Sequence, residues 1–240
     1  MNFFGRRRNF PYHKLSAVFV FFMLLPAPAV EAQPYFCTRK GAVCEYKRTI
    51  VASGKTKWLQ TLRIENVTWS EDGSGVVDYS SAFSGRNHLS EEPIRLRARI
   101  DTGGNVCIRL SEAMASVFRN VMPKADISVE GGVTALPSAM RPGDTLEDAV
   151  STVRAGIIKY TVTVSGRKVL RHEKLKTPAG EFDCMVIREH KEERAPGYSR
   201  TTNAYTWYSP GVGMVRHDTY NRNMKIETSE VLQKFQLCTE

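Results

Sequence analysis

The chain has 240 residues and a formal net charge of +9 at pH 7, and 42% of its residues are hydrophobic. A helix needs about 20 apolar residues to cross a bilayer. Apart from one stretch near the N-terminus, no segment approaches that length. We therefore expect no membrane-spanning segment in the rest of the chain. A length of about 200 residues without a low-complexity linker indicates one domain.

The first 32 residues have the layout of a secretory signal peptide. Basic residues at positions 6–8 and 14 precede an apolar run at 15–25, and small residues before Ala32 form a cleavage site. We expect export, cleavage after Ala32, and a mature chain of residues 33–240 in the periplasm, in the cell envelope or outside the cell. Cleavage removes four basic residues and one acidic residue, so the formal charge falls from +9 to +6.

The remaining positive charge bears on the choice of partner. It suits a lipid or another anionic component of the envelope, although a solvated surface that keeps the protein soluble explains it more simply. Nucleic acid is not an expected partner of an exported protein.

All the cysteines lie after residue 32, in a part of the chain that export would place in an oxidising compartment. They are Cys37, Cys44, Cys107, Cys184 and Cys238. Because their number is odd, at least one is free or pairs between chains, and the sequence does not select a pattern. As a hypothesis we pair Cys37 with Cys238, since both lie near chain ends that a closed sheet brings together.

The first clear strand signal covers residues 58–69. Leu62, Ile64 and Val67 alternate there with Arg63 and Glu65, which is typical of a strand with one buried face. Turn residues at 53–55 and at 71–75 flank this segment at hairpin spacing, so we expect the next strand at 76–83.

The cleanest alternation lies at residues 94–100, where apolar residues occupy one face and Arg95, Arg97 and Arg99 occupy the other. Successive outward positions on a strand are about 6–7 Å apart, so the three arginines form a ladder that could bind an anionic group. Arg109 is a further candidate. The alternative is a charged outer face that discourages pairing between sheet edges.

A helix follows this strand. Ser111 is a suitable N-cap, residues 112–122 place their apolar side chains on one stripe, and Pro123 would end the helix. The stripe consists of Met114, Val117, Phe118, Val121 and Met122.

Long alternating runs follow at 156–175, 182–193, 201–208, 212–220 and 224–235. We therefore predict an all-β fold: a curved antiparallel sheet that forms a barrel or half-barrel, with one or two short helices, of which one covers the apolar face of the sheet.

The segment 206–218 combines two aromatic residues, a proline, two glycines and a histidine. We interpret it as a hairpin that turns at 209–211, with Gly213 marking a bulge or a close approach by the ring of Trp207 or Tyr208. The two aromatic residues are core packing residues in this interpretation, and candidate ligand-binding residues if they line a groove.

The sequence contains no motif for catalysis or for metal binding. The histidines at 88, 172, 190 and 217 lack a partner at metal-ligand spacing, and the glycine pattern of a nucleophile elbow is absent. Acidic pairs such as 192–193 are adjacent, which sends their carboxylates to opposite faces of a strand. We therefore assign no catalytic residue, no metal and no cofactor.

Four segments carry a resemblance to a known family: 40–46 (KGAVCEY), 176–184 (KTPAGEFDC), 207–215 (WYSPGVGMV) and 228–232 (TSEVL). Their combination resembles the TapB-like family of exported proteins of Gram-negative bacteria, many of which are known only as a domain of unknown function. The resemblance implies an antiparallel β domain similar to the open barrels that carry lipids or lipoproteins in the envelope. It supplies no catalytic residue, cofactor or substrate.

Three functions remain open on this basis. The leading one is a non-enzymatic binding or carrier module for an apolar or amphipathic ligand, or for a partner in the envelope. The second is an exported hydrolase of envelope or dietary polymer, with Asp101, Asp144 or Asp218 as acids. The third is a structural component of the envelope.

Overall fold

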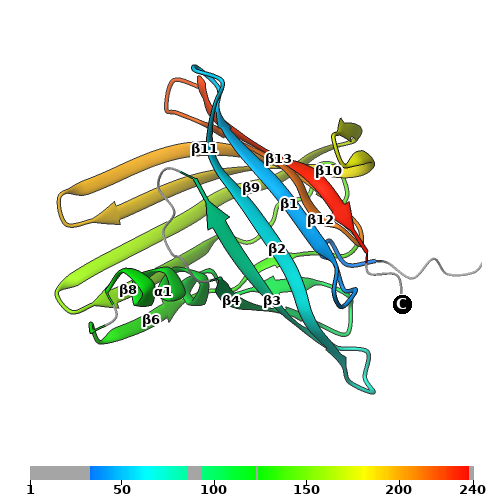
Figure 1. Cartoon of the computed structure of the whole chain (residues 1–240), viewed down its shortest axis with the longest axis horizontal. Coiled ribbons are helices and arrows are strands. Elements are labelled where there is room, and N and C mark those ends of the chain that lie inside the picture. The colour runs from blue at the N-terminus through cyan, green and yellow to red at the C-terminus, as the bar shows by residue number, and fades with distance from the viewer. Residues whose placement is uncertain (1–32, 86–92, 123, 238–240) are drawn as a thin grey trace, which may run out of the picture. The chain divides into compact units, whose positions relative to one another are not determined.

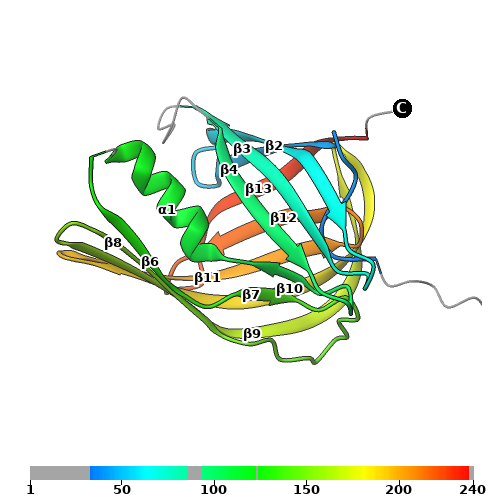
Figure 2. The same cartoon turned by 90° about the horizontal axis from the view of Figure 1, so that it is seen from below.

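The structure, a computed structural model, describes residues 33–85, 93–122 and 124–237. Within that part, one antiparallel sheet of 13 strands accompanies a single α-helix (Figures 1 and 2). The segment from Ala32 to Glu240 is one compact unit. The predicted signal peptide, Pro123 and Cys238 lie outside the described residues.

The elements are β1 (Val43–Ile50), β2 (Lys55–Trp69), β3 (Gly75–Ser84), β4 (Ile94–Ile100), β5 (Val106–Ile108), α1 (Leu110–Val121), β6 (Ile127–Gly131), β7 (Thr134–Leu136), β8 (Ala149–Ala155), β9 (Ile158–Thr177), β10 (Gly180–Ala195), β11 (Tyr198–Ser209), β12 (Gly213–Tyr220) and β13 (Ile226–Gln236).

The sheet is curved but not closed. Its strand order is β6-β8-β9-β10-β11-β12-β13-β1-β2-β3-β4-β5-β7, so β6 and β7 are the two edges. The first and last long strands meet in the middle, because β1 pairs with β13 from Val43–Gln236 to Ile50–Thr228. Figures 1 and 2 show the strands wrapping around an interior, with α1 beside β4, β6 and β8. The prediction of an all-β half-barrel with a short helix is confirmed.

The alternating patterns place the residues on the expected faces. In β4, Ile94, Ala98 and Ile100 are buried while the three arginines between them are exposed. In β2, Ile64 is fully buried, and a bulge between Ile64 and Asn66 returns Val67 to the inner face. That bulge explains why Val67 is offset from a strict alternation of two.

The apolar core lies on the inner face. It combines residues of several strands with Tyr35 and Phe36, which precede β1 and pack into the sheet. The rings of Phe36 and Tyr79 meet edge to face, with centroids 5.2 Å apart. Burial of such side chains stabilises the fold by about 1.5–3 kcal/mol each.

A buried arginine fixes the segment between β7 and β8 to the sheet. Arg167 donates from Nη1 to the carbonyl oxygens of Ala135 at 3.2 Å and Glu147 at 3.1 Å. Its Nε lies 3.7 Å from the carboxylate of Glu189. Burial raises the pKa of Glu189, and Arg167 opposes that rise.

The helix starts differently from the prediction. Arg109 occupies the N-cap position of α1 without a side-chain cap hydrogen bond, and Ser111 is buried inside the first turn. The Ser111 cap is therefore wrong, because β5 ends at Ile108 and leaves only Arg109 between strand and helix. Met114 and Phe118 of the predicted stripe are half-buried, and the Phe118 ring lies 5.8 Å from that of Tyr160. The side chains of Val117 and Val121 lie outside the described part.

The hairpin at 206–218 is confirmed, with β11 ending at Ser209 and β12 starting at Gly213. The predicted bulge at Gly213 is displaced: Gly213 pairs with Ser209, and the register shift between Trp207 and Tyr208 makes Val215 of β12 the extra residue. The close neighbour of Gly213 is not one of these rings: a Cβ at Gly213, where φ is +100°, would lie 3.6 Å from Cα of Phe36. The residues that approach it are Phe36 and Tyr35, because the chain before β1 passes this turn.

The cysteines that the structure describes, Cys37, Cys44, Cys107 and Cys184, are free thiols. The partner that we predicted for Cys37, Cys238, lies outside the described residues, and nothing in the described part supports a disulfide. Burial raises the pKa of both Cys44 and Cys184 to about 12, so both remain protonated at neutral pH.

We expect iodoacetamide to discriminate among these thiols. At about pH 8, the half-exposed Cys107 should react in the folded protein, while Cys44 and Cys184 should react only after unfolding, since the thiolate is the nucleophile. Peptide mapping after a short exposure measures the order. Labelling of Cys44 as fast as Cys107 would contradict the burial described above.

Candidate functional site

The cavity beside α1 lies between β2, β3, β4 and the helix, and its volume is about 960 Å³. It exists because β5 pairs only with Ala98–Ile100 of β4. The first half of β4 therefore has no strand on that side, and α1, which contacts β4, takes the place of one. Arg95 and Arg97 line this cavity, whereas Arg99 does not.

The polar lining combines four arginines with three carboxylates. The arginines are Arg95, Arg97, Arg109 and Arg119, and the carboxylates are Glu65, Asp78 and Glu112. Arg97 donates to Asp78 at 2.6 Å, Arg109 lies 3.7 Å from Glu112, and Glu65 accepts from Ser80 at 2.5 Å. Among the described residues, neither Arg95 nor Arg119 has a carboxylate partner. Two guanidinium groups therefore remain free to bind an anion.

Another part of the lining is apolar. It includes Tyr79, Leu96 and Ile108, which belong to the core or pack against it. Burial raises the pKa of Tyr79 to about 12, so its hydroxyl stays neutral. The cavity thus combines cationic and apolar walls, and its volume lies in the range of sites for small molecules, about 300–1,000 Å³.

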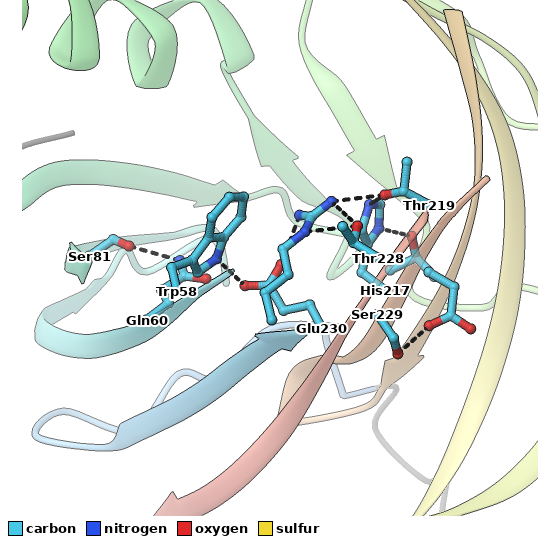
Figure 3. Close-up of polar contacts among 11 residues, drawn as sticks. Trp58, Gln60, Ser81, His217, Thr219, Thr228, Ser229 and Glu230 are labelled. Atoms are coloured by element: carbon cyan, nitrogen blue, oxygen red, sulfur yellow. Dashed lines mark hydrogen bonds and ion pairs between the residues drawn. The ribbon is translucent and has the colours of Figure 1, made fainter. Parts of the chain in front are cut away.

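A polar network occupies another part of the inner face, where β1, β2, β12 and β13 meet (Figure 3). Its centre is an ion pair between Arg48 and Glu230, with Nη1 3.1 Å from Oε2. The other oxygen of Glu230 accepts from Nε1 of Trp58 at 3.0 Å, and the guanidinium of Arg48 lies 4.7 Å from the centroid of the Trp58 ring. Both charged side chains are largely buried, with 16% and 6% of their surfaces exposed.

Threonine hydroxyls complete this network around Arg48 and His217. Arg48 donates to Thr228 at 2.8 Å and to Thr219 at 2.9 Å, and Thr219 lies 3.3 Å from Nε2 of His217. The other ring nitrogen of His217 lies 2.8 Å from Oγ1 of Thr206. Burial lowers the pKa of His217 to about 3, with Arg48 adding to the effect. The ring is therefore neutral at neutral pH and is too weak a base to activate a hydroxyl.

Trp207 and Tyr208 lie in different surroundings, since neighbouring residues of a strand point to opposite faces. Trp207 is buried, and its ring N–H donates to Glu173. The guanidinium of Arg216 lies over the ring, with Cζ 5.0 Å from the ring centroid. Tyr208 packs against the core of the inner face. Neither residue lines the cavity beside α1, so the structure does not bring them together with the arginines of β4.

The three aspartates considered for hydrolysis serve local structure. Asp101 accepts from Asn105 in the turn after β4, at 2.9 Å, and Asp144 accepts from the backbone N–H of Arg141 at 2.7 Å. Asp218 is buried, where Arg216 binds both of its oxygens and Ser229 donates to it at 2.6 Å. Figure 3 shows Ser229 pointing away from Thr228 and His217. None of the three aspartates lines the cavity beside α1.

The described part of the chain contains no group of three His, Cys, Asp or Glu side chains placed to hold a metal ion. Over the same residues, no helix has both the length and the apolar character needed to span a bilayer. Sequence reasoning missed Arg48, Glu230 and Arg119. The helical spacing of Arg109, Glu112, Ser116 and Arg119, which line one cavity, is the signal that could have identified Arg119.

Two solved structures share this fold. One is a chain from Bacteroides fragilis described as an exported protein with a YmcC-like fold, at 20% identity and a TM-score of 0.69. The other is a chain from Parabacteroides distasonis described as a lipoprotein, at 18% identity and a TM-score of 0.68. Each comparison covers 85% of this chain and 99% of the other. No curated protein matches the sequence significantly.

The family assignment comes from a model that matches residues 39–232. That range contains all of β1–β12 and the motifs at 176–184 and 207–215. The name TapB-like, which those motifs suggested, is not confirmed by the match. The match extends over most of the chain, which belongs to the DUF3108-like family.

Proposed function

We propose that this chain is a non-enzymatic binding protein that holds an amphipathic molecule with an anionic group in the cavity beside α1. The observation that carries the proposal is the pair Arg95 and Arg119, which line one cavity with an apolar wall and have no carboxylate partner among the described residues. Guanidinium groups bind sulfonate, phosphate or carboxylate through charge-assisted hydrogen bonds of about 1.5–3 kcal/mol each.

The apolar wall supports an amphipathic ligand rather than a small inorganic anion. Leu96 and Ile108 present aliphatic surface next to the arginines, and burial of such surface contributes about 25 cal/mol per Å². Export, expected from residues 1–32, would place the protein among envelope lipids and their precursors. The proposed ligand class is therefore an anionic lipid or lipid-like molecule of the envelope.

Two related fluorescent probes test the proposal. Anilinonaphthalene sulfonate is an anionic amphiphile, and phenylnaphthylamine has the same aromatic skeleton without the sulfonate. We expect the double variant Arg95→Gln/Arg119→Gln to bind the sulfonate about tenfold more weakly or worse, because it removes two charge-assisted hydrogen bonds, while affinity for the neutral probe changes little. Fluorescence titration of the folded variants measures both affinities.

Arg99→Gln is the matched control, since Arg99 is exposed on the same strand but does not line the cavity. It should leave both affinities unchanged. If Arg99→Gln and the double variant lost the same affinity for the sulfonate probe, the cavity would be rejected as the binding site. Equal affinity of the unmodified protein for the two probes would reject the proposal that the ligand needs an anionic group.

A further inference from the structure

The described hairpin turns lie at two ends of the sheet, and the two ends differ in charge. We define the cationic rim as four turns together with the residue pairs that close them. These are Ile50–Lys55, Ala155–Ile158, Ala195–Tyr198 and Tyr220–Ile226. The register places these turns at one end, because Ile50 pairs with Thr228, Asn203 with Tyr220, and Arg194 with both Thr161 and Ser199. Figure 1 shows the four hairpin tips along one side of the sheet.

The cationic rim carries Lys55, Arg222 and Lys225 and contains no carboxylate. The next residue pair of its hairpins adds Arg154, Lys159 and Arg194. Of these, Arg154 lies 3.8 Å from Glu130 and Arg194 lies 2.7 Å from Glu192. Glu227, which follows the β12–β13 turn, is bound by Arg200 at 2.6 Å. The connection between β3 and β4 falls mostly outside the described residues and is not part of the rim as named.

The opposite end has the reverse charge. Its turns and closing pairs are Trp69–Gly75, Ile100–Val106, Thr177–Gly180 and Ser209–Gly213. They contain Glu71, Asp72 and Asp101 and no lysine or arginine. The next residue pairs at this end add Arg99, Lys176 and Glu181. The separation of charge, with cations at one rim and carboxylates at the other, therefore belongs to the turns themselves.

Every turn of the cationic rim also exposes a large apolar side chain. Ile157 is 99% exposed, and Val51, Tyr198 and Met224 are exposed as well. Turn geometry does not require them. Gly156 supplies the positive φ of the β8–β9 turn, and Met224 itself has φ +56°, where glycine or asparagine is usual. The sulfur of Met224 accepts a hydrogen bond from Asn203, yet its side chain remains half exposed.

From this combination we infer that the cationic rim docks on the surface of an anionic phospholipid bilayer. Apolar side chains flanked by lysine and arginine suit the boundary between headgroups and acyl chains, where the cations meet lipid phosphates. A soluble polyanion would match the cations but leave the apolar side chains in water. A protein partner would favour one contiguous patch, whereas these apolar residues are spread over four separate turns.

Co-sedimentation with vesicles tests the inference, using the compact unit from Ala32 to Glu240. We expect it to bind vesicles of phosphatidylcholine mixed with phosphatidylglycerol, about tenfold more tightly than vesicles of phosphatidylcholine alone, and to be released by salt. The variant Ile157→Ser/Met224→Ser and the variant Lys159→Gln/Lys225→Gln should each weaken binding about tenfold. All four side chains belong to turns or turn flanks, so circular dichroism should show an unchanged fold.

Two variants away from the cationic rim are the controls. Val150→Ser removes an exposed apolar side chain near the start of β8, at the end away from the β8–β9 turn. Lys176→Gln removes a cation beside the opposite rim. Both should bind vesicles like the unmodified protein. Equal binding to both kinds of vesicle, equal losses in the controls, or capture by heparin beads without vesicle binding would each overturn the inference. Arg95→Gln/Arg119→Gln should bind vesicles normally, so this test is independent of the proposed ligand site.

Discussion

Replacing Glu230 by alanine should lower the free energy of unfolding by about 3–5 kcal/mol, the cost of breaking a buried ion pair from one side. Arg48 would keep its threonine partners but lose its counter-charge at 3.1 Å, and Nε1 of Trp58 would lose its acceptor at 3.0 Å. Urea unfolding followed by circular dichroism measures the difference.

Two further variants test the physical reason. Glu45 and Lys234 form an exposed ion pair at 3.6 Å on the same two strands, and Glu45→Ala should cost about 1 kcal/mol or less. The double variant Arg48→Met/Glu230→Met should be more stable than Glu230→Ala, because it leaves no unpaired charge inside the sheet. A Glu230→Ala protein no less stable than Glu45→Ala would show that water solvates the pair.

The fold was largely predictable because its signals are local. The alternation at 94–100 identified both the buried face and the exposed arginines of β4, since a strand repeats every two residues. The turn at 209–211 was equally clear from proline and glycine. The predicted Ser111 cap failed because the sequence does not show that β5 stops one residue before the helix.

The candidate site was only half predictable. Arg95 and Arg97 were identified, but their separation from Arg99 depends on the short length of β5 and on the position of α1. Those are tertiary features without a local signal. Arg48 and Glu230 were missed because 182 positions separate them, and they meet only through the pairing of β1 with β13.

The network around Arg48 and the cavity beside α1 have different physical roles. In the network around Arg48, hydroxyls, an indole and a carboxylate satisfy the guanidinium, so no group there is free for a ligand. In the cavity beside α1, two guanidinium groups face open space. A buried and satisfied arginine stabilises one arrangement of strands, whereas an unpaired and accessible arginine is available for binding.

Acid should destabilise the protein through His217. The pKa of His217 in the folded state is about 3, whereas an ordinary histidine has a pKa of about 6.5. The unfolded chain therefore takes up the proton first as the pH falls. The stabilisation from the neutral ring is therefore complete above about pH 6.5 and is lost progressively between about pH 6.5 and pH 3. Over that interval we expect a loss of about 3–5 kcal/mol from this residue.

The comparison of two glutamine variants isolates that contribution. His217→Gln keeps a side chain that can bond to Thr206 and Thr219 but cannot titrate, so its unfolding free energy should fall less steeply below about pH 6.5 than that of the unmodified protein. His172→Gln is the control for the loss of a histidine, since His172 is exposed beside Asp183 and lies outside the network. If His217→Gln and the unmodified protein lost stability in parallel, the ring of His217 would be protonated in the folded state. The network would then hold two cations, His217 and Arg48, around Thr219, with Glu230 as counter-charge.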